Sequence, residues 1–146
     1  MCSSDLAYPW SQSGFGSKYS NPSSGLGAQG TGVSFTSNGS TVALSYYAYP
    51  AIKVYPWSGS GFGTAYSDPS TKPEYNGNGV SFSPNNSAIA IVTNSTPYIF
   101  AYPWSGSGFG SKYSNPSTIP TGQGFGVAFS PDSSAIAIAH TSSPRV

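Results

Sequence analysis

The acidic residues and the single histidine are the side chains of this sequence that could support acid–base or nucleophilic catalysis. They are Asp5, Asp68, Glu74, Asp132 and His140. A glycosidase needs two facing carboxylates, and a serine triad needs a histidine that an acid holds in place. Asp68 precedes a proline and Asp132 follows one, which are turn positions, and nothing pairs with His140. We therefore expect no enzymatic activity and no catalytic residue.

Metal and cofactor chemistry has equally little support. The single cysteine, Cys2, cannot form a Cys-based zinc site, and the acidic residues do not cluster as Ca²⁺ ligands would. The glycine-rich segment 59–63 superficially resembles a phosphate-binding loop. However, it lacks the following Lys-Ser/Thr pair and a helix to present backbone donors. It indicates a tight hairpin, and we expect neither a metal nor a cofactor.

Aromatic side chains are the remaining candidates for binding, and they come in three equivalent sets. The sets contain Trp10, Trp57 and Trp104, with Tyr19, Tyr66 and Tyr113, and with Phe15, Phe62 and Phe109. A buried Trp or Tyr removes ~150–250 Å² from water, so these rings are predicted to pack neighbouring parts of the chain together. Stacking against sugars is the alternative, which would make glycans the partner.

The elements that position these rings belong to a 47-residue repeat. Tyr8-Pro9-Trp10 recurs at residues 55–57 and 102–104 without insertion or deletion. The second and third copies share 28 of 45 aligned residues, which chance does not produce. The predicted organisation is a non-repeat leader (1–7), repeat 1 (8–54), repeat 2 (55–101) and repeat 3 (102–146, incomplete). Residues 2–6 resemble a translated sequencing adaptor, so we expect a metagenomic fragment with a foreign leader.

Each copy predicts four short antiparallel strands. Gly126–Ser130 and Ala135–Ala139 alternate in side-chain size with a period of two, and a Pro-Asp turn joins them. Tyr98–Tyr102 is the predicted third strand of repeat 2, and Phe109–Tyr113 a short edge strand. The expected core of these sheets consists of large apolar residues on the first two strands: Val33, Phe35, Val80, Phe82, Ile89, Ile91, Val127, Phe129, Ile136 and Ile138.

The composition excludes several other classes of protein. Only 6% of residues are charged, against roughly 25% in average domains, and the net charge is +1. Such a chain has no basic field for nucleic acid, and no stretch approaches the ~20 apolar residues of a membrane span. Few strong helix formers are present. An all-β, loop-rich protein remains.

The strand–turn–strand segment of each copy resembles a known repeat family. Val127-x-Phe129-Ser130-Pro131-Asp132 is similar to the WD40 repeat, and the tryptophans stand where that family places its Trp. Serine follows each Trp where the family has Asp, no Gly-His pair opens a copy, and the period exceeds the usual ~40–45 residues. The Tyr-Pro-Trp-Ser segment resembles repeats of bacterial and tailed-phage proteins. The resemblance implies a propeller-like stack of four-stranded blades, a blade being the sheet of one copy.

The number of copies raises the question of how such a stack closes. Propellers typically have 4–8 blades, and this chain has three copies. It enters the repeat at the third strand and leaves it after the second, so its first and last half-blades are complementary. Three explanations stay open: a fragment of a longer propeller, two chains closing a six-bladed ring, or a contact that does not close and gives a fibre.

These observations favour a non-enzymatic structural protein that associates with itself head to tail. We expect it in a fibre, ring, virion or surface appendage, and hence at an extracellular or virion-associated location. A carbohydrate-binding, lectin-like propeller module is the first alternative, and a protein-interaction scaffold is the second. Neither nucleic acid nor a membrane span is expected among its partners.

Overall fold

The computed structural model describes residues 7–142, and this part of the chain is built from strands and turns without a helix. Residues 1–6 lie outside it, so the predicted foreign leader falls on positions that the structure does not describe. The strands form antiparallel sheets of two to four strands. The predicted all-β class is confirmed.

The largest sheet belongs to repeat 1 and its junction with repeat 2. Its strands are β3 (Gly30–Phe35), β4 (Thr41–Tyr46), β5 (Ile52–Ser58) and β6 (Gly61–Phe62), and they pair in chain order. The period-two alternation of large and small residues in β3 and β4 suits a pleated strand with two distinct faces. This sheet has the four strands that the repeat predicts.

The next sheet repeats this order with a weaker fourth strand. It consists of β7 (Gly77–Phe82), β8 (Ala88–Thr93) and β9 (Ile99–Pro103). At the expected edge strand Phe109–Tyr113, the structure has one isolated bridge, between Trp104 and Phe109. After Gly110, whose N–H donates to the Pro103 carbonyl, the chain leaves the ladder and returns only through Tyr113.

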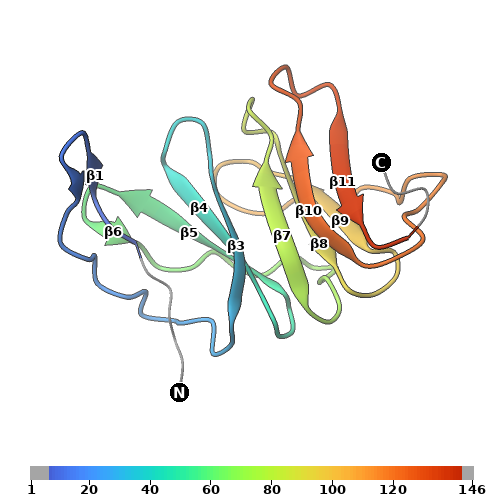
Figure 1. The fold of residues 1–146 in the computed structure, drawn as a ribbon, viewed down its shortest axis with the longest axis horizontal. Coiled ribbons are helices and arrows are strands. Elements are labelled where there is room, and N and C mark those ends of the chain that lie inside the picture. Colours follow the sequence, from blue (N-terminus) through green and yellow to red (C-terminus); the bar gives the residue numbers. More distant parts are fainter. Residues whose placement is uncertain (1–6, 143–146) are drawn as a thin grey trace.

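Two hairpins occupy the ends of the described chain. The first pairs β1 (Trp10–Ser11) with β2 (Gly14–Phe15), and the last pairs β10 (Gly124–Phe129) with β11 (Ile136–His140). In the repeat, β1 and β2 correspond to the third and fourth strands, whereas β10 and β11 correspond to the first and second. Figure 1 shows the two hairpins at opposite ends of the molecule.

The turn between the first two strands has the same hydrogen bonds in every copy. A side-chain oxygen accepts the backbone N–H two residues further on, in the pairs Asn38–Ser40, Asn85–Ser87 and Asp132–Ser134, each at 3.1 Å. The residue in between has a positive φ, which is 61° at Ser133. Asp132 therefore acts as a turn residue, as its place after a proline predicts.

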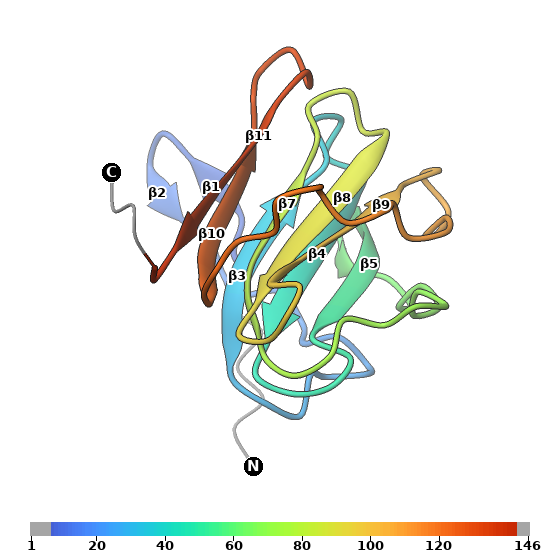
Figure 2. The same ribbon diagram turned by 90° about the vertical axis from the view of Figure 1, so that its right-hand side faces the viewer.

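The sheets stand in a row with their first strands β3, β7 and β10 side by side (Figures 1 and 2). Glycines allow this approach. A Cβ on Gly32 would lie 3.1 Å from the Gly79 Cα, and a Cβ on Gly79 would lie 3.0 Å from the Phe125 carbonyl oxygen. Only a residue without a side chain lets the backbones come this close.

Hydrogen bonds connect the same strands at equivalent positions. The Thr31 hydroxyl donates to the Gly77 carbonyl at 2.7 Å, and the Asn78 amide donates to the Gly124 carbonyl at 2.7 Å. The contact between successive sheets therefore repeats with the sequence. Within residues 7–142 the row stays open, without a closed barrel or ring of sheets, and the propeller arrangement remains a prediction.

Candidate functional site

The interface between successive sheets is the feature that the repeat builds most consistently. We call the side of a sheet that faces the following repeat its far face, and the opposite side its near face. Between the β3–β6 and β7–β9 sheets, aliphatic residues of the far face (Ala43, Ile52, Val54) meet aliphatic and aromatic residues of the near face (Val80, Phe82, Ile89, Ile91, Phe100, Tyr102, Trp104). All of these are buried, so this interface is a hydrophobic core.

Trp104 lies at the centre of an aromatic cluster within this interface. Its ring makes edge-to-face contacts with Tyr66, Phe82 and Phe109, at centroid distances of 5.2, 5.6 and 5.2 Å. Tyr66 comes from the linker that follows the preceding sheet. Trp104 is only 4% exposed, so its ring is surrounded by two successive repeats.

Trp57 has the same surroundings one repeat earlier. It contacts Tyr19 at 5.2 Å, Phe35 at 5.3 Å and Phe62 at 5.0 Å, again edge to face. The structure thus brings together two of the three aromatic sets that the sequence singles out. Each assembled cluster takes its tyrosine from one repeat and its tryptophan from the next.

The third tryptophan is left without a partner repeat. Trp10 is 72% exposed and contacts only Phe15, at 5.1 Å, among the described aromatic rings. At the other end of the chain, Tyr113 and Phe129 occupy the positions of the residues that surround Trp57 and Trp104. No ring of residues 7–142 stacks on either of them. The third cluster is therefore split between the two ends of the molecule.

The tyrosines of the second and third Tyr-Pro-Trp motifs add polar anchors. The Tyr55 hydroxyl donates to the Ser24 carbonyl at 2.6 Å, and the Tyr102 hydroxyl donates to the Thr71 carbonyl at 2.7 Å. Burial raises the pKa of the Tyr102 phenol, which stays a neutral donor. These two motifs thus fasten their strands to the linker of the preceding repeat.

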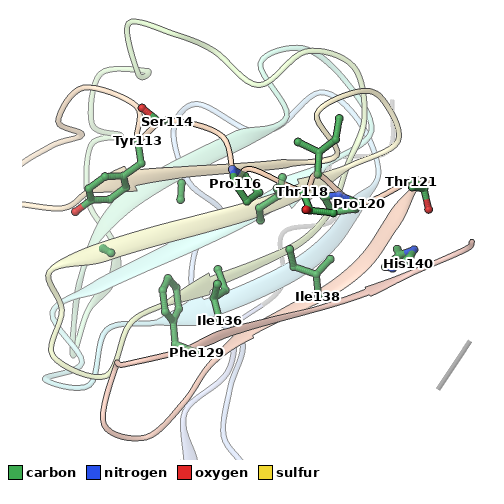
Figure 3. A pocket seen from close by; sticks show the side chains of 14 residues that line it. Tyr113, Ser114, Pro116, Thr118, Pro120, Thr121, Phe129, Ile136, Ile138 and His140 are labelled. Carbon is green, nitrogen blue, oxygen red and sulfur yellow. The ribbon is translucent and has the colours of Figure 1, made fainter. Parts of the chain in front are cut away.

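A groove of about 670 Å³ opens beside β11. Phe129, Ile136 and Ile138 point into it from the β10–β11 hairpin, facing the linker residues between Tyr113 and Thr121 (Figure 3). Most of its lining is apolar. The equivalent place in the preceding repeat is filled by β9, which pairs with β8 as a third strand. The groove is the space that a third strand would take.

A second cavity of about 440 Å³ lies on the near face of the β3–β6 sheet, between β3 and the segment around Tyr8. Val33 and Phe35 line it and are 60% and 47% exposed. Their equivalents Val80 and Phe82 are buried by the preceding sheet. The near face of this sheet has no sheet covering it within the described chain.

The burial of the expected core residues therefore depends on which sheet they belong to. Val80, Phe82, Ile89 and Ile91 are buried, and Val127, Phe129 and Ile138 are partly buried. For Val33, Phe35 and Ile136 the expectation of burial is corrected, because all three side chains are exposed. Their strands form as expected, but the neighbouring sheet or strand that buries the equivalent residues is not present there.

Asp68 and Asp132 accept hydrogen bonds that stabilise their charged forms. Partial burial acts to raise the pKa of Asp68, but hydrogen bonds from Lys53 at 2.7 Å and Lys72 at 3.2 Å outweigh it and lower that pKa. Hydrogen bonds from Ser130 and Ser134 lower the pKa of exposed Asp132 to about 2.

The other candidate ligands do not gather into a site. His140 Nδ1 accepts a backbone N–H at 3.3 Å. Residues 7–142 hold no group of three His, Cys, Asp or Glu side chains that could bind a metal. Asp5 and Cys2 lie outside the described residues. The candidate site is thus the apolar interface between sheets.

Sequence reasoning missed the glycines and hydroxyls that fit one sheet to the next. Gly32, Gly79 and Gly126 stand 47 residues apart in a Gly-x-Gly-Val motif, and this spacing could have indicated a close backbone approach. The roles of Tyr55 and Tyr102 had no such signal, because a carbonyl acceptor can be supplied by any residue.

No helix in the described part of the chain is long and apolar enough to cross a membrane. No model of a protein family matches this sequence, and no curated protein matches it significantly. The repeat and its interface are therefore the basis of any functional conclusion.

Proposed function

We propose that this chain is a non-enzymatic structural protein that associates with further copies of itself, head to tail, through its two open faces. One observation carries the proposal. The exposed far face of the β10–β11 hairpin and the near face of the β3–β6 sheet correspond to the two sides of an interface that successive sheets of the chain already form.

The side chains on the open faces support this proposal. The near face of the β3–β6 sheet presents Val33, Phe35 and Leu44, which are large and apolar. The far face of β11 presents Ala137 and Ala139, which are small and exposed. At both internal junctions an aliphatic far face meets a near face that also carries aromatic rings. Exposed apolar surface with a matching counterpart is typical of an interaction site.

The propeller arrangement belongs to this proposal. Its support is the row of first strands, with glycines and hydrogen bonds repeated at equivalent positions. Successive copies would continue this row as blades, in a ring if the rotation closes and in a filament if it does not. A charge-poor assembly of this kind suits a virion or a surface appendage, where we place it.

Carbohydrate binding has less support than self-association. Trp104 is buried between sheets and Trp57 is partly covered, so neither offers a free flat face to a sugar ring. No particular feature of the described chain favours a scaffold for other proteins. Self-association is therefore the function that the geometry supports best.

Sedimentation velocity on the purified chain tests the proposal. From micromolar to near-millimolar concentration, we expect the mass to rise above the 15.0 kDa monomer in multiples of that value. A limiting dimer would indicate a ring, and continued growth, visible as fibres by electron microscopy, would indicate a filament. A mass that stays at 15.0 kDa throughout would overturn the proposal.

A further inference from the structure

We propose that the open edge of β11 is an acceptor site for one segment of a second copy, residues 7–15, which completes the β10–β11 hairpin to a four-stranded sheet. This inference rests on the proposed self-association and adds to it the interacting segment and its register. The order of the completed sheet would be β10, β11, the second copy's β1 and the second copy's β2.

The donor segment already has the conformation of a third and fourth strand. Trp10 pairs with Phe15, as Trp57 pairs with Phe62 in the β5–β6 hairpin. The Ala7 carbonyl accepts the Tyr19 N–H at 2.9 Å, the distance found at both equivalent positions. One edge of the segment is thus bonded, and within residues 7–142 no strand lies along the other.

The register on the acceptor edge follows from the two sheets in which the second and third strands of the repeat already pair. In them Val42 stands opposite Tyr55, and Ile89 stands opposite Tyr102. Moving this pairing by one repeat places Ile136 opposite Tyr8 of the second copy. The same step places Ala135 opposite Pro9, at a ladder position where Pro56 and Pro103 already stand.

The side chains of the donor match the groove. Trp10 would enter between Tyr113 and Phe129, completing the third aromatic cluster in the way that Trp57 and Trp104 complete the others. The Tyr8 hydroxyl would reach the Thr118 carbonyl in the linker that lines the groove, one repeat after the Tyr102–Thr71 bond. An arbitrary strand would lack both anchors.

Residues 7–15 lie at the other end of the same chain, so the donor that we propose is this segment of a second copy. Figure 1 places the β1–β2 and β10–β11 hairpins at opposite ends of the row, with two sheets between them. The donor's own near face supplies a second contact. Once residues 7–15 are docked, the completed sheet would also cover Val33 and Phe35, which are exposed in the described chain. One binding event therefore closes both cavities.

A mixed disulfide tests the register directly. Ala43 stands opposite Val54 and Ala90 opposite Ala101, so Ala137 is expected opposite Ala7 of the second copy. In a Cys2→Ser background, an Ala7→Cys chain is mixed with an Ala137→Cys chain and oxidised. Directly opposed residues of antiparallel strands lie within disulfide range, so we expect a mixed dimer, with the linked peptides identified by mass spectrometry.

The matched control replaces Ala137→Cys with Ala128→Cys. Ala128 stands opposite Ala137 on β10 and is also exposed, but lies one strand further from the donor. We expect at least about tenfold less mixed disulfide from this pair. Self-association without a preference for Ala137→Cys would overturn the inference and leave the proposed function intact. A chain that stays monomeric would overturn both.

Truncation of the aromatic anchor gives an independent readout. Trp10→Ala removes a ring that is 72% exposed and whose one aromatic contact within residues 7–142 is Phe15, so the fold should be unaffected. We expect its association constant to fall by about tenfold or more, as for a central interface tryptophan, whereas Tyr47→Ala, at an exposed tyrosine outside both cavities, should not change it. Equal association of the two variants would contradict this donor segment.

Discussion

Asp132 shows how one position of the repeat can change its charge and keep its structural role. Its carboxylate accepts hydrogen bonds from Ser130 and Ser134, and Asn85 accepts the same set from Ser83 and Ser87. The turn requires an acceptor oxygen, which both side chains have, and does not require a charge. Asp132, the one acidic residue among the three equivalent turn positions, therefore has the same structural role as Asn38 and Asn85.

Replacing Asp132 with asparagine should remove part of the acid sensitivity of the fold. The pKa of Asp132 is about 2, below the ~3.9 of an unfolded aspartate. Its contribution to stability is thus present above about pH 4 and is lost as the pH falls through about 2. We expect Asp132→Asn to flatten the pH dependence of the urea midpoint between pH 2 and 5.

Asp68→Asn is the comparison for that measurement. It removes a different lowered pKa, held down by Lys53 and Lys72, and leaves the Asp132 turn unchanged. The two variants should flatten the profile independently, so that the double variant shows the sum. A profile for Asp132→Asn that matches wild type would contradict the role of this carboxylate.

Asp68 also shows compensation between equivalent positions. In the other copies this position is Asn, and a lysine three residues earlier donates to it at 2.6 Å, in the pairs Lys18–Asn21 and Lys112–Asn115. In repeat 2 the lysine is replaced by Ala65, and Lys53 from β5 supplies the donor at 2.7 Å. This position thus keeps a lysine donor, although in repeat 2 the donor comes from a strand and not from the linker itself.

For individual strands, the sequence predicts that a strand is present better than it predicts the residues at which the strand begins and ends. The second strand expected at Ala135–Ala139 is β11 (Ile136–His140), because its alternation of large and small residues is unambiguous. The fourth strand is reduced to two residues or a bridge, since its hydrogen bonds end at the glycine after the phenylalanine.

The assembly of the candidate site was harder to predict. The spacing of Tyr66 and Trp104 shows only that both recur, and packing decides that the tyrosine of one repeat meets the tryptophan of the next. Likewise Val33 and Val80 occupy equivalent positions of the repeat, yet only Val80 is buried. Burial depends on neighbouring sheets, which a local pattern does not contain.

Gly79→Ala should destabilise the contact between β7 and β10. The new Cβ would lie 3.0 Å from the Phe125 carbonyl oxygen and 3.4 Å from the Gly126 Cα, so one backbone must move. Overpacking of this kind costs about 1–3 kcal/mol, measured as a lower free energy of unfolding in urea.

Gly59→Ala is the control for this substitution, because nothing lies within 4 Å of the Cβ that it adds. Its effect should stay within about 0.5 kcal/mol, as for most surface changes. If both alanines destabilised the chain equally, close approach of the first strands would not be the reason for the glycine at position 79.

At the scale of the whole molecule, the chain resembles a segment of a larger periodic object. The apolar core between its first two sheets has a counterpart at the next junction, although the last sheet has only two strands within residues 7–142. The two exposed surfaces differ in shape, one with large side chains and one with a groove. Self-association through unlike surfaces is heterologous, and its closure depends on the rotation per copy.

Gly126→Ala separates folding from assembly. Among residues 7–142, the nearest atom to a Cβ at this position is the Ala139 Cβ, at 4.0 Å, so the isolated chain should fold with unchanged or slightly higher stability. In a head-to-tail assembly, Gly126 would meet Gly32 of the next copy as Gly32 meets Gly79, where a Cβ would approach the neighbouring Cα to 3.1 Å. We therefore expect an unchanged urea midpoint at dilute concentration and association weakened by about tenfold, read by sedimentation velocity. Wild-type association of this variant would mean that the first strands of neighbouring copies do not meet as β3, β7 and β10 do.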